Sequence, residues 1–282
     1  MLRLSFSGKP GNTYLTGKMI RQSIRGAEKS SPEGFRYRGL EISRLENMTD
    51  AVFGFAITLL VISTEVPQSY VQLQASMYSF IGFVFCTMLL LSIWNSHNRF
   101  FQYFGLEDPT TKVLNFLFLF LLLFYVYPLK YLFSFLGTAI LATISISLGD
   151  QSPALNLAVE ELSKSNLNTQ QWADLMIRFG LGLFFIYLLF SLMYVHALRK
   201  KSLLQLNDLE IFITQTHIQA YLILMGITIL SMLIVILLGG NYSEYSGFVY
   251  LLIPILLPLH RRRRKRQFCS PIKPEESPPS LE

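Results

Sequence analysis

The fold of this chain is decided by residues 211–238, which read IFITQTHIQAYLILMGITILSMLIVILL and hold His217 as their only ionisable side chain. A helix needs roughly 20 apolar residues to cross a bilayer, and this stretch is long enough. Strand edges and loops that face lipid would leave their backbone groups unpaired. Residues 211–238 therefore predict a transmembrane helix.

Four further runs are almost free of charge. Residues 52–62, 66–98 and 179–198 contain no Asp, Glu, Lys or Arg, and residues 113–135 contain only Lys130. Over the whole chain 15% of residues are charged, whereas soluble domains carry about a quarter. We therefore expect an all-α, polytopic membrane protein.

The apolar runs predict six crossings. They are placed at residues 48–66, 73–101, 112–136, 173–198, 214–238 and 248–259. Pro128 is expected to kink the third crossing. Residues 137–171 form the longest connection, and their first part, residues 137–148, is apolar enough to be considered as a seventh crossing. The sixth crossing is short and contains Pro254 and Pro258, so a re-entrant segment is the alternative there.

Basic residues decide between these topologies, because Lys and Arg concentrate in cytoplasmic loops. Six crossings place every basic cluster at a helix end inside the cell, namely Arg44, Arg99, residues 199–201 and residues 261–266. The outer loops then hold one basic residue, Lys164. Adding a crossing near residue 140, or removing the sixth, would move a cluster outside. The prediction is a multi-pass protein of the cell membrane with both termini in the cytoplasm.

The distribution of charge and cysteine along the chain indicates its domains and its partners. Residues 1–43 are expected to be a basic, flexible cytosolic tail, residues 44–260 the transmembrane domain, and residues 261–282 a second basic cytosolic tail. The net charge of +6 comes from clusters that flank the crossings, which predicts contacts with anionic lipid head groups and no nucleic-acid partner. Cys86 and Cys269 are expected to be reduced and far apart.

Ionisable residues gather at the cytoplasmic ends of the first two crossings. Arg44 and Asp50 open the first, in RLENMTD, and His97 lies near the end of the second, in IWNSHNRFF. A carboxylate at the edge of the hydrocarbon is costly unless it is paired, so Asp50 is expected to pair with Arg44 or His97. A second interpretation stays open, in which Thr49 or Asp50 only caps the helix N-terminus.

These two segments resemble the transmembrane protein 175 family of potassium channels, in its prokaryotic single-repeat form. That family opens its first helix with Arg, three intervening residues and Phe-Ser-Asp, and its second helix ends with a Trp three residues before a His. The matching positions are Arg44, Met48, Thr49, Asp50, Trp94 and His97, so that Met-Thr replaces Phe-Ser. The match is close over residues 44–136. Trp94 alone would also suit an interfacial anchor.

The resemblance implies a homotetramer of six-helix subunits around a central pore that is permeable to, or selective for, potassium. The first helix of each subunit lines this pore and narrows it with apolar rings. No Thr-Val-Gly-Tyr-Gly filter occurs in the sequence. Counting from Asp50 gives the constriction as Phe55, Leu59 and Ile62, with Thr58 beside them. The residues implied to brace the pore helix are Arg44, Thr49, Asp50, Trp94 and His97.

Helical spacing agrees with this constriction. Phe55, Thr58, Leu59 and Ile62 are three or four residues apart, so they share one stripe of a helix. Ordinary packing of a membrane helix gives the same pattern, so the assignment depends on the resemblance. The family has Ile or Leu where Phe55 stands. A ring of phenylalanines is expected to close the pore more fully, or to gate it by dewetting.

Two other functions remain as alternatives. A secondary transporter would show internal repeats and mid-membrane charges, but the halves share no repeat, and Lys130 and Arg178 lie near the outer ends of their crossings. An intramembrane metalloenzyme would use the four histidines, which lack the i, i+3 or i+4 spacing of helical metal ligands. The prediction is a passive channel, not an enzyme, with no cofactor and no metal except potassium in transit.

Overall fold

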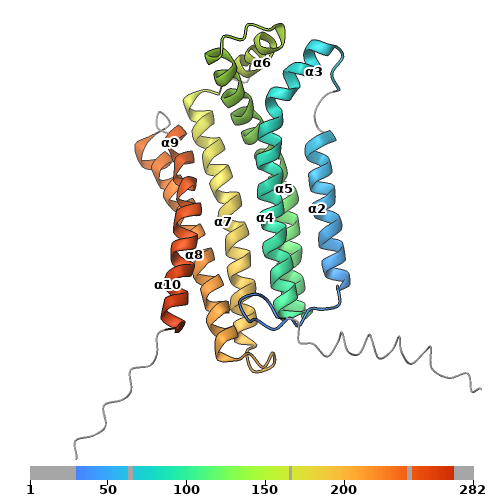
Figure 1. Ribbon diagram of the computed structural model, residues 1–282, viewed down its shortest axis with the longest axis vertical. Helices are drawn as coiled ribbons and strands as arrows, with labels where there is room; N and C mark the ends of the chain where they lie inside the picture. The colour runs from blue at the N-terminus through green and yellow to red at the C-terminus, as the bar shows by residue number, and fades with distance from the viewer. Residues whose placement is uncertain (1–29, 63–65, 165–166, 240–242, 270–282) are drawn as a thin grey trace, which may run out of the picture.

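The computed structural model describes residues 30–62, 66–164, 167–239 and 243–269. Within these residues the chain is helical, apart from an isolated β-bridge between Ser30 and Arg36. The long helices run side by side along the longest axis of the molecule (Figure 1). The all-α class predicted from the sequence is confirmed for the described residues.

The helices follow one another along the chain with short connections. Their bounds are α2 (Arg44–Ile62), α3 (Tyr70–Ser76), the 3-10 turn η1 (Met77–Ser79), α4 (Phe80–Phe104), α5 (Pro109–Ser147), α6 (Pro153–Lys164), α7 (Thr169–Arg199), α8 (Asp208–Leu238), α9 (Ser243–Phe248), the 3-10 turn η3 (Val249–Leu252) and α10 (Ile253–Cys269).

Four helices of the described residues are long and apolar enough to cross a membrane. They are residues Tyr70–Phe104, which join α3, η1 and α4, and the helices α5, α7 and α8. These are the second to fifth predicted crossings. The first predicted crossing is α2, which holds Arg44, Glu46 and Asp50 in its first two turns. The sixth is divided between α9, η3 and α10.

Helix α5 is longer than predicted. The sequence placed its end near Leu136, whereas the helix continues to Ser147 and includes the stretch weighed as a seventh crossing. The predicted helix end was wrong, because the apolar residues 137–147 continue the third helix instead of beginning the connection. Gly82 of α4 and Gly137 of α5 face each other so closely that a Cβ on either would overlap backbone of the other helix. This contact extends the helix pair beyond the predicted end.

Polar caps begin the two helices that form the most extensive helix pair. Asn168 precedes α7 and Asn207 precedes α8, and the side-chain oxygen of each accepts a hydrogen bond from the backbone N–H three residues later. In return, the side chain of Gln171 or Glu210 accepts a hydrogen bond from the backbone N–H of the asparagine. These capping boxes satisfy backbone donors that a helix N-terminus leaves free. Helix α7 packs between α8 on one side and α5 on the other, which makes it the centre of the subunit.

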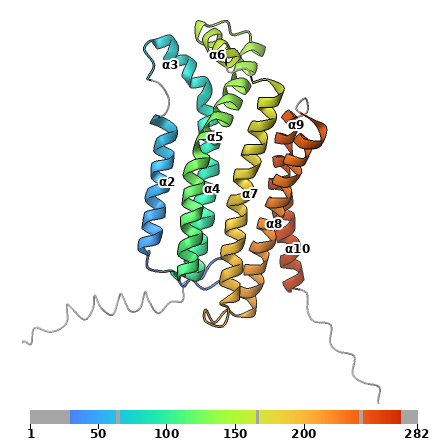
Figure 2. The ribbon, with the colours of Figure 1, turned by 180° about the vertical axis from the view of Figure 1, so that it is seen from behind.

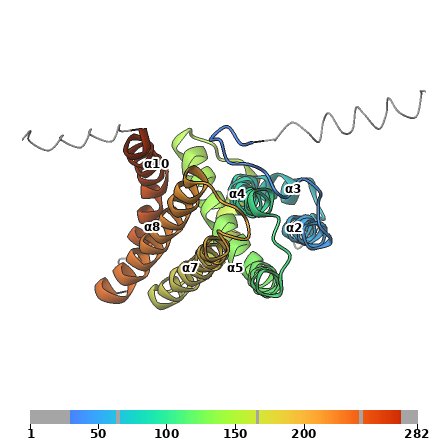
Figure 3. The same ribbon diagram turned by 90° about the horizontal axis from the view of Figure 1, so that it is seen from below.

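Helix α2 lies at the edge of the bundle, where it packs mainly on α4 and α5 (Figures 2 and 3). Its packed face consists of residues spaced three or four apart, as expected for one side of a helix. They are Leu45, Thr49, Phe53, Ala56 and Leu60, each 8% exposed or less. Among the described helices, none packs extensively on the opposite face of α2.

Both predicted tails contain ordered structure. Residues 30–43 fold across the ends of α4 and α8, and Phe35 is completely buried there. At the other end of the chain, α10 continues through Arg261 and Arg266 to Cys269, so the expected boundary after His260 falls inside a helix. The described part of the predicted N-terminal tail, residues 30–43, thus packs against the helices. Cys86 is a free, buried thiol, and the side chain of Cys269 lies outside the described residues.

Candidate pore helix and its polar network

Two of the predicted constriction residues lie on the exposed face of α2. Phe55 is 57% exposed and Thr58 is also exposed, while Leu59 is half-buried at the border of the packed face. Gly54, next to Phe55, has no described neighbour outside its own helix within 4 Å of the position a Cβ would take. Ile62 ends the helix, and its side chain lies outside the described residues. The described chain thus leaves Phe55 and Thr58 of α2 exposed.

Thr58 is the polar member of this stripe. Its hydroxyl donates to the carbonyl oxygen of Gly54 in the preceding turn, at 2.8 Å. The hydroxyl proton is therefore used within the helix, and the lone pairs of Oγ1 remain directed away from it. A threonine in this state can offer oxygen to a cation without leaving a donor unsatisfied.

A buried chain of three polar side chains joins α2, α4 and α5. The hydroxyl of Thr49 donates to the carbonyl oxygen of Leu45 at 2.9 Å, and the amide nitrogen of Asn115 donates to Thr49 Oγ1 at 3.0 Å. The Asn115 oxygen lies 2.6 Å from Nε2 of His97. Since that oxygen only accepts, His97 must carry its hydrogen on Nε2. All three side chains are at most 2% exposed.

Aromatic contacts hold this network against the packed face of α2. The ring of His97 stacks on Phe118 with a centroid distance of 5.4 Å and an interplanar angle of 14°. Phe118 in turn contacts Phe53 of α2 at 6.0 Å. The imidazole is therefore fixed both by its hydrogen bond and by its stacking partner, which leaves it no room for another rotamer.

Asp50 pairs with a neutral partner. Its Oδ1 accepts a hydrogen bond of 2.7 Å from the indole Nε1 of Trp94. The predicted partners were Arg44 or His97, and in the described part of the chain no ion pair joins Asp50 to either. Arg44 is exposed at the start of α2, whereas His97 turns inward to Asn115. The predicted pairing of Asp50 with Arg44 or His97 was therefore wrong, and its partner is Trp94, another residue of the implied bracing set.

Asn115 is the member of the network that the sequence analysis missed. It lies in the apolar run of residues 113–135, where a single amide is the one polar side chain before Tyr125. A lone polar side chain in a membrane helix needs a partner, and this signal was available. What the sequence lacked was the spatial relation of Asn115 to His97 and Thr49, which are 18 and 66 residues away.

A second polar cluster is centred on Asp108, which lies just outside the helices that could span a membrane. Asp108, in the turn before α5, accepts hydrogen bonds from Thr111 at 2.7 Å and from His196 at 2.9 Å, and Lys200 lies 3.1 Å away. Burial alone would raise the pKa of Asp108, but the bonds from Thr111, Lys200 and His196 outweigh it and hold this pKa well below its usual range. The cluster ties the α4–α5 turn to the end of α7.

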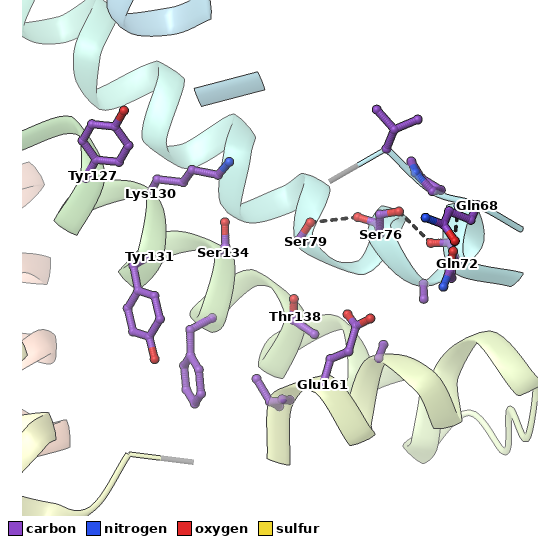
Figure 4. A pocket seen from close by; sticks show the side chains of 16 residues that line it. Gln68, Gln72, Ser76, Ser79, Tyr127, Lys130, Tyr131, Ser134, Thr138 and Glu161 are labelled. Carbon is purple, nitrogen blue, oxygen red and sulfur yellow. Dashed lines mark hydrogen bonds between the residues drawn. The ribbon is translucent and has the colours of Figure 1, made fainter. Parts of the chain in front are cut away.

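Two clefts border these helices. The smaller, of 350 Å³, opens beside the polar network and is lined by Asp50, Trp94, His97 and the segment from Gly39 to Ile42. The larger, of 1360 Å³, lies at the opposite end of the bundle between α3, α5 and α6 (Figure 4). Its walls carry Lys130 and Glu161 together with hydroxyl and amide groups. Within the described residues, no group of three or more His, Cys, Asp or Glu side chains could hold a metal ion.

The fold and the site define a class: a helical, polytopic membrane protein whose helix α2 packs by one face and leaves Phe55 and Thr58 exposed on the other. Comparison with known proteins then identifies the family. The sequence profile described as endosomal/lysosomal potassium channel TMEM175 matches residues 44–125. A protein of Marivirga tractuosa named as a potassium channel is 41% identical over 236 residues, which cover 82% of this chain and 92% of the relative.

A solved structure gives the same assignment. A crystal structure of a variant of the potassium channel MtTMEM175, in complex with a nanobody–MBP fusion protein, matches with a TM-score of 0.70 and 38% identity. The match covers 84% of this chain and 99% of the other. The chain belongs to the TMEM175 family of potassium channels. The resemblance, the channel function and the statement that the protein is not an enzyme are thereby confirmed, and the transporter and metalloenzyme alternatives are set aside.

Proposed function

We propose that four copies of this chain assemble around a central axis and that the uncovered face of α2 from each copy lines a potassium pore. The observation that carries the proposal is the asymmetry of α2, which buries Thr49, Phe53 and Ala56 against its own subunit and leaves Phe55 57% exposed on the other side. A single six-helix chain has only one such helix, so several copies are needed to enclose a path.

An uncovered apolar face could also lie against lipid, and two features favour the pore. The stripe includes Thr58, whose hydroxyl oxygen retains its lone pairs for an ion, a group that lipid would not use. The helix also begins with Arg44, Glu46 and Asp50, and charges at this level are better accommodated next to water than next to acyl chains. Membership in a potassium channel family supports the same choice.

In this assembly Phe55, Leu59 and Ile62 form apolar rings and Thr58 a ring of hydroxyls between them. Apolar rings gate by dewetting when they are narrow, so Phe55 sets the resistance of the pore. The network of Thr49, Asp50, Trp94 and His97, extended by Asn115, braces α2 against α4 and α5 and fixes the direction in which Phe55 points. Arg44, exposed at the mouth, contributes charge there.

The proposed topology has six crossings, with α2 as the first and the segment from α9 to α10 as the last. Both termini then lie in the cytoplasm, as the basic clusters require. Helix α10 carries Arg261–Arg266 on an exposed helical surface, and residues 199–201 lie at the same end of the bundle (Figure 1). We propose that these two clusters bind anionic lipid head groups, each basic residue adding roughly 1 kcal/mol.

The test is potassium flux into liposomes that contain the purified protein. Phe55→Ala removes the proposed narrow ring and is expected to raise the flux several-fold. Phe120→Ala is the matched control, because Phe120 is an exposed phenylalanine, at 74%, of α5 and not of the proposed pore helix. Equal flux from Phe55→Ala, Phe120→Ala and the wild-type protein would contradict the pore assignment, and so would the absence of any potassium flux from the wild-type protein.

A further inference from the structure

We infer that Glu210 is a positioning residue for the pore helix, and that it acts through residues 30–43, here named the N-terminal strap. The inference rests on the proposed function, since it concerns the helix that lines the pore. Glu210 belongs to α8, which does not pack against α2. The strap gives the shortest connection from Glu210 to the pore helix, because it bonds to Glu210 and leads directly into Arg44 at the start of α2.

Glu210 holds two arginines of the strap. Its side chain is completely buried, and Oε1 accepts from the backbone N–H of Arg36 at 3.1 Å and from its Nε at 3.0 Å. Oε2 accepts from Nη2 of Arg36 at 3.0 Å and from Nη2 of Arg38 at 2.7 Å. Forked, charge-assisted bonds of this kind fix orientation as well as distance. The buried carboxylate of Glu210 holds the strap in place, because release of the two arginines would leave its negative charge buried without a partner.

Two arginine contacts continue onto the α7–α8 connection. Arg36 Nη2 donates to the carbonyl oxygen of Gln205 at 2.8 Å, and Arg38 Nε donates to that of Leu204 at 3.0 Å. The strap therefore sits on both the connection and the first turn of α8. No comparable constraint would be needed for a tail that served only as an extension of the chain.

A second set of contacts fixes the strap to α4. Phe35 stacks on Tyr103 with a centroid distance of 4.1 Å. The backbone N–H groups of Arg38 and Gly39 both donate to the carbonyl oxygen of Gln102, at 3.0 and 3.1 Å. A Cβ on Gly39 would overlap the carbonyl group of Phe101, so only glycine permits this approach. Residues Arg38 and Gly39 of the strap are thus held against the last turn of α4.

The strap is joined to α2 by a short, stiff connection. Ser43 and Glu46 form a reciprocal pair, in which the backbone N–H of Ser43 donates to Glu46 Oε1 at 3.0 Å and that of Glu46 donates to Ser43 Oγ at 3.1 Å. This capping box sets the angle at which the chain enters α2. From Gly39 to Arg44 the chain can span at most about 18 Å. A shift of the strap must therefore displace the cytoplasmic end of α2.

The test compares Glu210→Gln with Asp208→Asn. Both changes remove one negative charge from the first turn of α8, but Asp208 is exposed and is bonded to neither arginine of the strap. Two readouts are used: single-channel open probability in planar bilayers, and the distance between spin labels on residues 47 and 199, in a Cys269→Ser background with labelled subunits diluted by unlabelled ones. A purely structural role would lower the yield of assembled protein without changing the open probability of the channels that remain.

Glu210→Gln is expected to change the ratio of open to closed channels by roughly fivefold or more, the usual lower range of coupling between sites. It is also expected to broaden the distance between the labels, while Asp208→Asn leaves both values at the wild-type level. Combining Arg36→Gln with Glu210→Gln should add little, because both act on the same contact. If Glu210→Gln does not fold, Arg36→Gln replaces it, since Arg36 is 34% exposed and tolerates substitution better.

An unchanged open probability in Glu210→Gln, or in Arg36→Gln where that variant replaces it, overturns the inference, even if the label distance changes. Equal effects of Glu210→Gln and Asp208→Asn also overturn it, because they would reflect charge alone. A wild-type protein that conducts no potassium contradicts the proposed function instead. In that case the distance between the labels tests the inference about the strap. A broader distance distribution in Glu210→Gln supports the inference that the strap positions α2, and an unchanged distribution overturns it.

Discussion

The indole nitrogen of Trp94 lies 2.7 Å from a carboxylate oxygen of Asp50 and donates a hydrogen bond to it. This bond joins α4 to α2 near the start of α2. A neutral donor stabilises the carboxylate without adding a charge that would have to be removed from water. Trp94 is therefore a structural partner of α2, and the alternative of a simple interfacial anchor does not account for its bond.

Trp94→Phe keeps the aromatic volume and removes the donor. We expect it to lower the stability of the detergent-solubilised protein by about 1 kcal/mol, the usual net contribution of a hydrogen bond. Thermal unfolding measures the effect. Trp172→Phe is the control, because Trp172 contacts Phe135 through its ring. A loss of stability in the control as large as that in Trp94→Phe would show that the bond to Asp50 contributes little.

Asn115→Ala is expected to destabilise the protein by roughly 2–4 kcal/mol, because it leaves two buried groups, Thr49 Oγ1 and His97 Nε2, without their partner. Thr49→Val should lower the stability less, since it breaks only one of the two bonds of Asn115 and leaves the bond to His97 in place. The comparison uses thermal unfolding, with exposed Asn95→Ala as the control. Equal losses from Asn115→Ala and Thr49→Val would mean that His97 does not depend on Asn115.

Gly82→Ala should separate α4 from α5. A Cβ at residue 82 would overlap the backbone carbonyl of Phe133, and backbone cannot move aside as a flexible side chain can. We expect a loss of roughly 1–3 kcal/mol, seen as a lower unfolding temperature. Gly226→Ala is the matched control in another membrane helix, where a Cβ meets no atom within 4 Å. It should be neutral or stabilise α8 by up to about 1 kcal/mol.

Asp108→Asn tests the cluster at the α4–α5 turn through its pH dependence. The folded protein holds the pKa of Asp108 below its usual value, so ionised Asp108 stabilises the folded state. This contribution is fully present above the pKa of Asp108 in the unfolded chain, about 3.9. It is lost as the pH falls through the lower pKa of Asp108 in the folded protein.

The difference in unfolding temperature between the wild-type protein and Asp108→Asn should therefore be constant from pH 7 to about pH 5. Below about pH 4 it should shrink. Unfolding curves measured at intervals between pH 7 and pH 3 provide the check. A difference that grows on acidification would have the wrong sign for a carboxylate with a depressed pKa.

Most of the helical framework could be predicted from the sequence because charge-free runs mark membrane helices directly. The beginning of α2 at Arg44 followed from the motif that opens it. The end of α5 was missed because the basic clusters excluded a further crossing in the apolar residues 137–148, which were therefore assigned to the connection. No proline lies between Gly137 and Ser147, and these residues extend the preceding helix instead.

The pairings within the site were less predictable. Asp50 and His97 were correctly placed at one level, but the partner of each depends on side-chain direction, which sequence spacing does not report. The bond between Arg36 and Glu210 joins residues 174 positions apart. In the sequence Glu210 looks like an ordinary N-terminal helix residue and Arg36 like part of a basic tail. Contacts of this range leave no local pattern to recognise.

The most direct test of the account is a cryo-electron microscopy structure of the assembled protein in lipid nanodiscs, examined at α2. The account predicts four subunits with Phe55 and Thr58 of every copy directed to the common axis and with Thr49 turned away from it toward Asn115. A map in which α2 lies at the outer rim with Phe55 against lipid, or in which the protein is a single subunit, would contradict it.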